Sequence, residues 1–288
     1  MHPNNPYQKL YDFKQLVSAY PKLGKFVTTN LSGELTIQFG DSAAVYALNK
    51  AILLADYKLI DYIIPKGYLI PPIPGRLDYL LHLQDFYKEK TGTSPLKVLD
   101  IGAGANTIYC ILGAQHFNWT MVGAESDYDA VNIAKQNIST TLSLQEKIEI
   151  RHQENKSFLF KGIIKAKEQF DITVCNPPFH GSKEEALKGT LRKQTNLNLQ
   201  NQKKDRTSNF EGQANELWCN GGETLFIKRL IKESTRFKSQ VRFFSSLVAK
   251  ASSLPNVEKQ LVKSKANYEV LRMEQGNKIS RCVVWWYN

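Results

Sequence analysis

Hydrophobic and polar positions follow two different patterns along the chain, and the pattern changes near residue 90. Before that point, apolar residues recur at the spacing of one helix face in three stretches, and a small hairpin is expected at residues 31–39 around Gly33. The helical stretches are residues 11–20, 43–55 and 77–87. We interpret residues 1–90 as a mostly helical, RNA-binding extension that caps the rest of the chain.

After residue 90, short apolar runs alternate with helical patterns, which predicts a parallel sheet with helices on both faces. Strands are expected at residues 97–101, 120–125, 147–151, 170–175, 240–248, 268–273 and 279–287. Helices are expected at residues 106–115, 127–137, 223–237 and 255–265. Residues 91–288 are therefore expected to form an α/β domain with a Rossmann-like seven-stranded sheet. Its last two strands are antiparallel and joined near Gly276-Asn277, which is the layout of a class I methyltransferase.

Two segments interrupt this pattern. Residues 71–76 are proline-rich and are expected to form a rigid, extended connector, with Arg76 at the start of the next helix. Residues 183–210 lack an apolar face and are expected to form a mobile basic loop over a nucleic-acid substrate, the alternative being an uninvolved solvated loop. The basic residues expected to bind nucleic acid are Lys183, Lys188, Arg192, Lys193, Lys203, Lys204 and Arg206.

Composition and charge narrow the class of protein. The net charge of +11, from 38 basic and 27 acidic residues, favours a polyanionic partner such as nucleic acid. No apolar run is long enough to span a membrane, and the first residues lack an apolar signal core, so we expect a cytoplasmic protein. The four cysteines are widely spaced and are expected to be reduced, and the five histidines show no metal-ligand spacing.

A glycine-rich turn follows the first strand of the expected sheet. Asp100 lies one residue before the end of this strand, Gly102 and Gly104 form a tight turn, and Asn106 begins a helix. Glycines let the backbone approach a ligand closely and present N–H groups at the helix start. A dinucleotide-binding turn would have a third glycine where Thr107 stands, and it would not usually carry an acidic residue just before the first glycine. The turn therefore favours S-adenosylmethionine as the cofactor, and Asp100, Gly102, Gly104 and Asn106 are expected to bind it.

Glu125 ends the second expected strand, where a carboxylate can accept hydrogen bonds from the ribose hydroxyls of a nucleoside. A lone Gly-x-Gly can also be a plain strand–helix turn. Glu125 and Asn176, both at strand ends, make the cofactor interpretation the stronger one.

The most informative stretch is Asn176-Pro177-Pro178-Phe179, at the end of an apolar strand. The prolines forbid both helix and ladder pairing, so Asn176 and the Pro177 carbonyl lie on a stiff turn at the carboxyl end of the strand. Together they offer two acceptors for the two N–H donors of an exocyclic amine, and Phe179 offers a face for a flat base. The alternative is a strand that ends in an Asx-Pro turn with Phe179 in the core.

Several motifs together resemble the bacterial ribosomal RNA adenine-N6 methyltransferases of the RlmF type, which are related to eukaryotic methyltransferase-like RNA enzymes. The motifs lie at residues 2–5, 11–13, 71–76, 100–109, 175–180 and 215–223. The resemblance implies transfer of a methyl group from S-adenosylmethionine to N6 of one adenosine in 23S ribosomal RNA. It also implies that Arg76, Gly102 and Glu125 contact the cofactor, while Asn176 through Phe179 hold the adenine.

Other functions stay open at this point. The same Asn-Pro-Pro-aromatic turn serves adenine methyltransferases that act on DNA, and the target could also be another RNA. Enzymes that methylate a glutamine amide in a protein share the turn but would have no use for a charge of +11. A non-catalytic RNA-binding module would keep the basic surface but would not need Gly102, Gly104 and Asn176 together.

Overall fold

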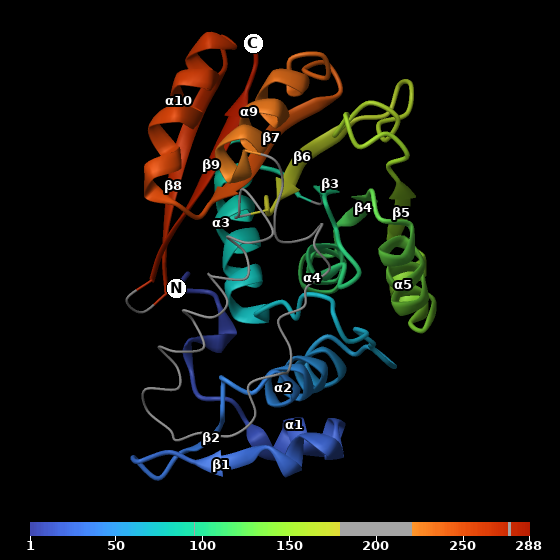
Figure 1. The fold of residues 1–288 in the computed structure, drawn as a ribbon, viewed down its shortest axis with the longest axis vertical. Helices are drawn as coiled ribbons and strands as arrows, with labels where there is room; N and C mark the ends of the chain where they lie inside the picture. The colour runs from blue at the N-terminus through green and yellow to red at the C-terminus, as the bar shows by residue number, and fades with distance from the viewer. Residues whose placement is uncertain (95, 179–220, 276–277) are drawn as a thin grey trace.

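The computed structural model describes residues 1–94, 96–178, 221–275 and 278–288, and its centre is a seven-stranded sheet (Figure 1). The strands are β3 (Lys97–Ile101), β4 (Thr120–Glu125), β5 (Ile148–His152), β6 (Phe170–Cys175), β7 (Val241–Val248), β8 (Asn267–Gln275) and β9 (Lys278–Trp286). They lie in the order β5-β4-β3-β6-β7-β9-β8. The first five in this order are parallel, and β9 pairs antiparallel with both β7 and β8. This layout confirms the expected class I methyltransferase fold.

Helices cover both faces of the sheet, as expected, because the central strands are apolar on both sides. Alternate residues of β3 belong to different cores: Val98 packs with α3 (Ile73–Thr91), α4 (Ile108–Phe117) and α5 (Tyr128–Ser139), and Leu99 packs with the other face. That other face is covered by α9 (Gly222–Ser234) and α10 (Leu254–Lys263), which lie side by side (Figure 1).

The N-terminal elements lie below the sheet in Figure 1 and share a core with it. They are η1 (Pro6–Gln8), α1 (Phe13–Ala19), η2 (Pro21–Lys25), the antiparallel hairpin β1 (Val27–Thr29) and β2 (Leu35–Ile37), and α2 (Ser42–Ala55). Asp12 and Asp41 cap α1 and α2 by accepting hydrogen bonds from backbone N–H groups of the first turn. Phe13 and Ile52 belong to the same hydrophobic cluster as Leu77 and Ile111. The boundary near residue 90 stays a prediction.

The prediction of an extended connector at residues 71–76 is wrong in its second half. Helix α3 begins at Ile73, with Pro72 at its N-cap, so Arg76 lies inside the first turn. Pro74 does not break the helix because the N–H groups of a first turn have no intrahelical acceptor. The sequence patterns also missed α6 (Leu142–Gln145) and η3 (Ala251–Ser253), which are short. The expected turn at Gly276-Asn277 lies outside the described residues.

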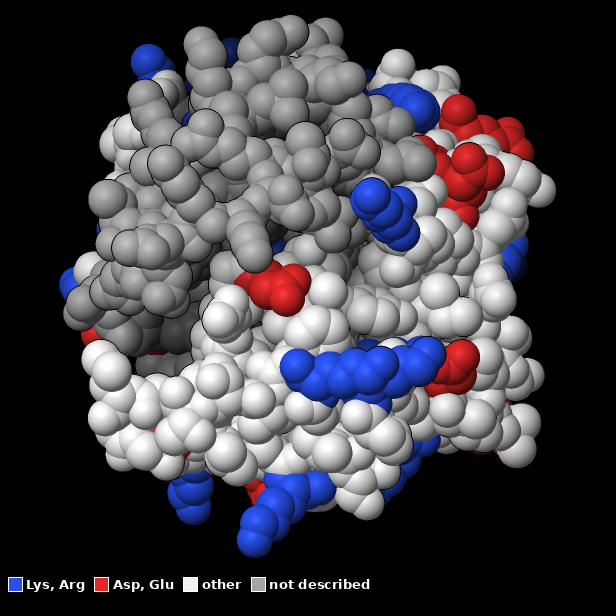
Figure 2. Space-filling model, turned by 60° about the horizontal axis from the view of Figure 1, so that its bottom comes forward, with Lys and Arg blue, Asp and Glu red and all other residues white. Residues whose placement is uncertain are grey.

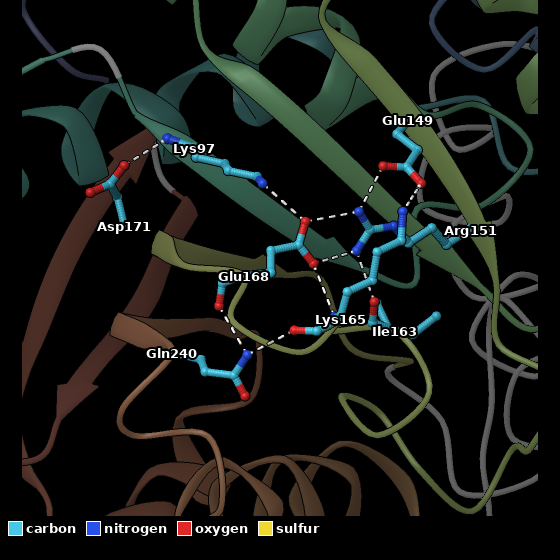
Figure 3. A network of polar contacts seen from close by, with 8 residues as sticks. All are labelled: Lys97, Glu149, Arg151, Ile163, Lys165, Glu168, Asp171 and Gln240. Atoms are coloured by element: carbon cyan, nitrogen blue, oxygen red, sulfur yellow. Dashed lines mark hydrogen bonds and ion pairs between the residues drawn. The ribbon is translucent and has the colours of Figure 1, made fainter.

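A network of charged and amide side chains joins Lys97 at the start of β3 and Arg151 near the end of β5 to the connection before β6 (Figure 3). The guanidinium of Arg151 donates to both carboxylate oxygens of Glu168 at 2.7 and 2.9 Å and to Glu149 at 2.6 Å. Lys97 Nζ donates to Glu168 at 2.9 Å, and the Gln240 side-chain amide donates to the Glu168 carbonyl at 2.9 Å. Both Arg151 and Glu168 are nearly buried, at 10% and 9% exposed, so these contacts tie β5, β3 and β6 together.

No helix in the described part of the chain has both the length and the apolar character that crossing a membrane requires.

Candidate active site

A cavity of about 470 Å³ lies where β3, β4, β5 and β6 end. Open α/β sheets bind ligands at this edge because the turns that follow parallel strands meet there. Predicted site residues that line it are Arg76, Gly102, Gly104, Asn106, Glu125, Asn176 and Pro178. The structure therefore brings the expected cofactor turn and the expected Asn-Pro-Pro turn to one cavity.

The glycine-rich turn has the geometry that only glycine adopts readily. Gly102 and Gly104 have φ angles of +76° and +64°, in the left-handed region. Thr107 also has a positive φ of 50°, although a β-branched residue is strained there. The turn packs closely on β4 because Gly123 has no side chain: a Cβ on Gly123 would lie 3.1 Å from the Cβ of Ala103.

Glu125 is held in place by backbone amides. Its carboxylate accepts hydrogen bonds from the N–H groups of Gly104 at 2.9 Å, Ser126 at 2.6 Å and Asp127 at 2.9 Å. The Ser126 hydroxyl also donates to Glu125 Oε1 at 3.4 Å, whereas Oε2 accepts only the Gly104 N–H, so Oε2 keeps an acceptor position for a ligand hydroxyl. The side chain therefore braces the glycine-rich turn and still faces the cavity.

Asp100 differs from the expectation because it does not line the cavity. It is fully buried; its Oδ2 accepts a hydrogen bond from the Cys110 thiol at 3.7 Å, and its Oδ1 has no hydrogen-bond partner. Burial raises the pKa of Asp100 to about 7, with the nearby charge of Glu125 adding to the rise and that of Arg76 opposing it. A direct contact between Asp100 and the cofactor is thus not supported by its position, and its effect on the cavity is electrostatic.

Arg76 reaches the cavity from the first turn of α3. One of its terminal nitrogens donates to the Tyr109 hydroxyl at 3.0 Å, and its guanidinium carbon lies 5.6 Å from the centre of the same ring. Its Nε is buried without a hydrogen-bond partner. A buried guanidinium N–H without an acceptor is costly, so this group is suited to an anionic ligand group.

Asn176 follows directly after β6 and is half-buried. Its Oδ1 is also buried without a hydrogen-bond partner, on the wall of the same cavity. Pro178 lines the cavity, and Pro177 is buried and does not. Phe179 and the seven basic residues predicted to bind nucleic acid at 183–206 lie outside the described residues.

The described cysteines Cys110, Cys175 and Cys282 are buried free thiols, in agreement with the expectation. Burial raises the pKa of the Cys110 and Cys175 thiols well above the ordinary value.

Sequence reasoning missed the outer wall of the cavity. Gln153, Lys156 and Phe158 follow the end of β5, and Phe226 and Arg229 come from α9. The carboxyl end of a third neighbouring strand was the available signal for the first group. The α9 residues gave no such signal because α9 lies far along the chain and meets the cavity only through the packing of the sheet.

The sheet order, the antiparallel last strand and the glycine-rich turn beside an acidic residue on the next strand define a class I methyltransferase. The sequence profile of a family described as RNA methyltransferase matches residues 1–288. The chain belongs to this RNA methyltransferase family, which confirms the expectation of a methyl-transferring enzyme.

Similar proteins cover the whole chain. The chain is 48% identical over 288 residues to ribosomal RNA large subunit methyltransferase F of Christiangramia forsetii, with 100% of both chains covered. It is 42% identical over 290 residues to the protein of the same name in Escherichia coli (strain HS), covering 100% of this chain and 93% of that one.

Two solved structures are similar over the full length. The hMettl16 catalytic domain in complex with the MAT2A 3′UTR hairpin 6 has a TM-score of 0.81 and 29% identity, covering 100% of this chain and 98% of that one. The N-terminal domain of human METTL16 in complex with SAH has a TM-score of 0.78 and 27% identity, covering 100% and 99%.

Proposed function

We propose that this protein transfers a methyl group from S-adenosylmethionine to N6 of one adenosine in the 23S RNA of the large ribosomal subunit. The observation that carries the proposal is the buried, unpartnered Oδ1 of Asn176 on the wall of the cavity that also holds the glycine-rich turn. A buried acceptor of this kind needs a donor, and an exocyclic amine supplies one. The same proposal includes a cytoplasmic location, in keeping with a ribosomal RNA substrate.

The residues on the cavity wall fit S-adenosylmethionine. Glu125 is placed to accept from ribose hydroxyls, and the backbone of Gly102 and Gly104 allows close approach of the ligand. The unpartnered Nε of Arg76 suits the carboxylate of the methionine part. An acceptor on Glu125 and a buried donor on Arg76 thus belong to the lining of one cavity and match the ribose hydroxyls and the carboxylate of this ligand.

The chemistry needs positioning more than acid–base help. S-adenosylmethionine supplies an electrophilic methyl group. Asn176 Oδ1 and the carbonyl of Pro177 would each accept one hydrogen of the adenine amino group, which directs the nitrogen lone pair at the methyl carbon. The bound cofactor would supply the methyl group and leave as S-adenosylhomocysteine, and the methylated nitrogen would then lose one proton to water. Both oxygens stabilise the positive charge that develops on the nitrogen.

The ribosomal RNA substrate is supported by the names of the relatives from Christiangramia forsetii and Escherichia coli. We propose that Phe179 stacks on the extruded adenine, since the target atom of a paired or stacked base must be exposed before transfer. The basic segment at 183–210 is proposed to contact the RNA backbone through its seven basic residues.

The test is transfer of radiolabelled methyl from S-adenosylmethionine to ribosomal RNA purified from cells that lack this gene. The expected result is label at the amino group of a single adenosine of 23S RNA, mapped by nuclease digestion and mass spectrometry. RNA from cells that carry the gene should accept no label, because its site is already filled. Label on duplex DNA, or label on no nucleic acid at all, would contradict the proposal.

A further inference from the structure

The excess positive charge is concentrated in the last quarter of the chain. Residues 221–288 hold 13 basic and five acidic residues, a net charge of +8. Residues 1–94 have a net charge of +2, and residues 179–220 also have +2. In Figure 2, which brings the bottom of the molecule in Figure 1 forward, lysine and arginine side chains are interspersed with acidic and uncharged ones on the described part of this face.

Much of this charge lies on the outer side of α9 and α10. The inner side of both helices is apolar and packs on the sheet through Ile227, Leu230, Val257 and Leu261. The exposed basic residues of the two helices and of the segments that flank them are Arg229, Lys232, Arg236, Lys238, Lys250, Lys259, Lys263 and Lys265. We call this surface the α9–α10 face.

The acidic residues of α9 do not neutralise this surface because their carboxylates accept hydrogen bonds from backbone N–H groups of other segments. Glu223 is 2% exposed, and its carboxylate accepts from the backbone N–H groups of Ala249 at 2.5 Å and Lys250 at 3.1 Å. Glu233 accepts from three successive N–H groups at residues 159–161, at 2.8 to 3.0 Å. An ordinary solvated helix face mixes both signs, whereas here Glu258 is the single acidic residue that α10 contributes.

The two helices form one continuous surface. Thr224 and Ser253 hydroxyls are 3.0 Å apart, and Lys228 Nζ donates to the Asn256 side chain at 3.4 Å. Within the described ranges, none of Lys232, Lys259 and Lys263 forms an ion pair. These side chains are therefore available to an external anion.

The α9–α10 face reaches the rim of the candidate active site. Arg229 lines the cavity from α9, and its guanidinium donates to the carbonyls of Lys156 at 3.1 Å and Ser157 at 3.2 Å. Lys156 lines the cavity as well and is exposed. A polyanion that lies along α9 would thus pass the opening through which the target nucleotide must enter.

We propose that the α9–α10 face binds the phosphate backbone of the RNA that flanks the target adenosine. This inference rests on the proposed function, and it assigns a second contact surface separate from the segment at 183–210. Backbone binding by lysines neutralises phosphates and releases counterions, so it depends steeply on salt and little on sequence.

The experiment compares two triple variants that remove the same charge. Lys232→Gln, Lys259→Gln and Lys263→Gln are combined on the α9–α10 face. The control combines Lys88→Gln, Lys135→Gln and Lys167→Gln, which are exposed residues on other elements. Binding of each protein to protein-free 23S RNA transcript is measured by fluorescence anisotropy across a range of salt concentrations. Affinity for S-adenosylhomocysteine reports that each variant keeps its folded cavity.

For the α9–α10 variant, the expected result is a loss of RNA affinity of about tenfold or more at near-physiological salt. The slope of the logarithm of the association constant against the logarithm of the salt concentration should be shallower by roughly 2 than that of wild type. The control variant should keep most of the affinity and slope. Equal losses in both variants, or no loss in the α9–α10 variant, would overturn the inference.

Methyl transfer by wild type is measured in parallel and separates this inference from the proposed function. If wild type methylates RNA but the α9–α10 variant binds RNA normally, only this inference fails. If wild type binds RNA through this face but methylates none, only the proposed function fails.

Discussion

Asp100 and Asn176 each carry a buried side-chain oxygen, but the two residues differ in their position relative to the cavity and in their charge. Both Oδ1 atoms lack a hydrogen-bond partner, but only Asn176 lines the cavity. An amide acceptor stays neutral at every pH, so its cost of burial is modest and is recovered when a donor arrives. A buried carboxylate is far more costly when ionised, which is why the pKa of Asp100 is raised to about 7.

The raised pKa of Asp100 leads to a prediction on stability. Because the folded protein binds the proton more tightly than the unfolded chain, whose Asp has a pKa of 3.8, the ligand-free protein loses stability as the pH rises from about 4 to about 7. Asp100→Asn removes the charge and should remove this loss. Its stability relative to wild type should grow over that range by on the order of 4 kcal/mol at most.

Urea unfolding of both proteins between pH 4 and pH 8 measures this difference. A difference in unfolding free energy that stays constant over the whole range would show that Asp100 is ionised throughout.

At the scale of the residue, the sequence alone identified the cavity-lining parts that follow β3, β4 and β6. It did so because the carboxyl ends of parallel strands meet at one edge, so Gly102, Glu125 and Asn176 had to converge. It assigned Asp100 to cofactor contact, although this side chain is buried away from the cavity. Asp100 is the residue before the last of β3, and the direction of a side chain so near a strand end depends on the local twist, which a single sequence does not specify.

At the scale of the element, the strands β3, β4 and β6 were predicted at their observed bounds because they are short apolar runs between clear turns. Helix α3 was predicted to start later than it does, since prolines within a pattern usually indicate a stop. Pro74 falls in the first turn instead, where proline is tolerated. The start of a helix depends on where its first turn packs, and Ile73 is fully buried.

The packing of the glycine-rich turn against β4 predicts the effect of one added methyl group. In Gly123→Ala the new Cβ would lie 2.7 Å from the Ile150 side chain and 3.1 Å from both Ala103 and Cys110. These neighbours are buried, so we expect the unfolding free energy to fall by about 1 to 3 kcal/mol and the affinity for S-adenosylhomocysteine to fall with it.

Gly24→Ala is the matched control, because its Cβ would only reach ordinary contact with Val17 at 3.5 Å. Urea unfolding and calorimetric titration measure both effects. A Gly123→Ala protein as stable as the Gly24→Ala protein would show that the turn has room to move.

At the scale of the whole molecule, the Arg151–Glu168 network couples β5 to the start of β3 and to the connection before β6 (Figure 3). The hydrogen bonds from Arg151 lower the pKa of Glu168 to about 2. A depressed pKa means that the stabilisation is fully present above about pH 4.5 and is lost as the pH falls toward 2.

Glu168→Gln should therefore cost about 1 to 3 kcal/mol of unfolding free energy at pH 7, and this cost should shrink as the pH approaches 2. Glu146→Gln is the control, since Glu146 is exposed and forms no ion pair with the other described residues. Unfolding by urea at several pH values measures the cost. A cost that is equal for both variants would mean that the network does not stabilise the fold.

The distribution of charge over the whole molecule could not be predicted from local patterns. The basic segment at 183–210 is conspicuous in the sequence because seven basic residues and no apolar face occur within 28 residues. The basic residues of α9 and α10 are dispersed along the chain, and they form one surface because the sheet places the two helices side by side (Figure 1). Helix packing also turns Glu223 and Glu233 inward, which leaves the outer side positive.

The most direct test of the account is the rate of methyl transfer by Asn176→Ala in a single turnover, with 23S RNA from cells that lack the gene. If the Asn176 oxygen holds the adenine amino group, the activation free energy should rise by about 3 kcal/mol. The rate should then fall more than a hundredfold, while S-adenosylhomocysteine still binds. Asn176→Asp keeps an acceptor oxygen and should retain more of the rate. A rate for Asn176→Ala close to that of wild type, with the fold and cofactor binding intact, would contradict the account.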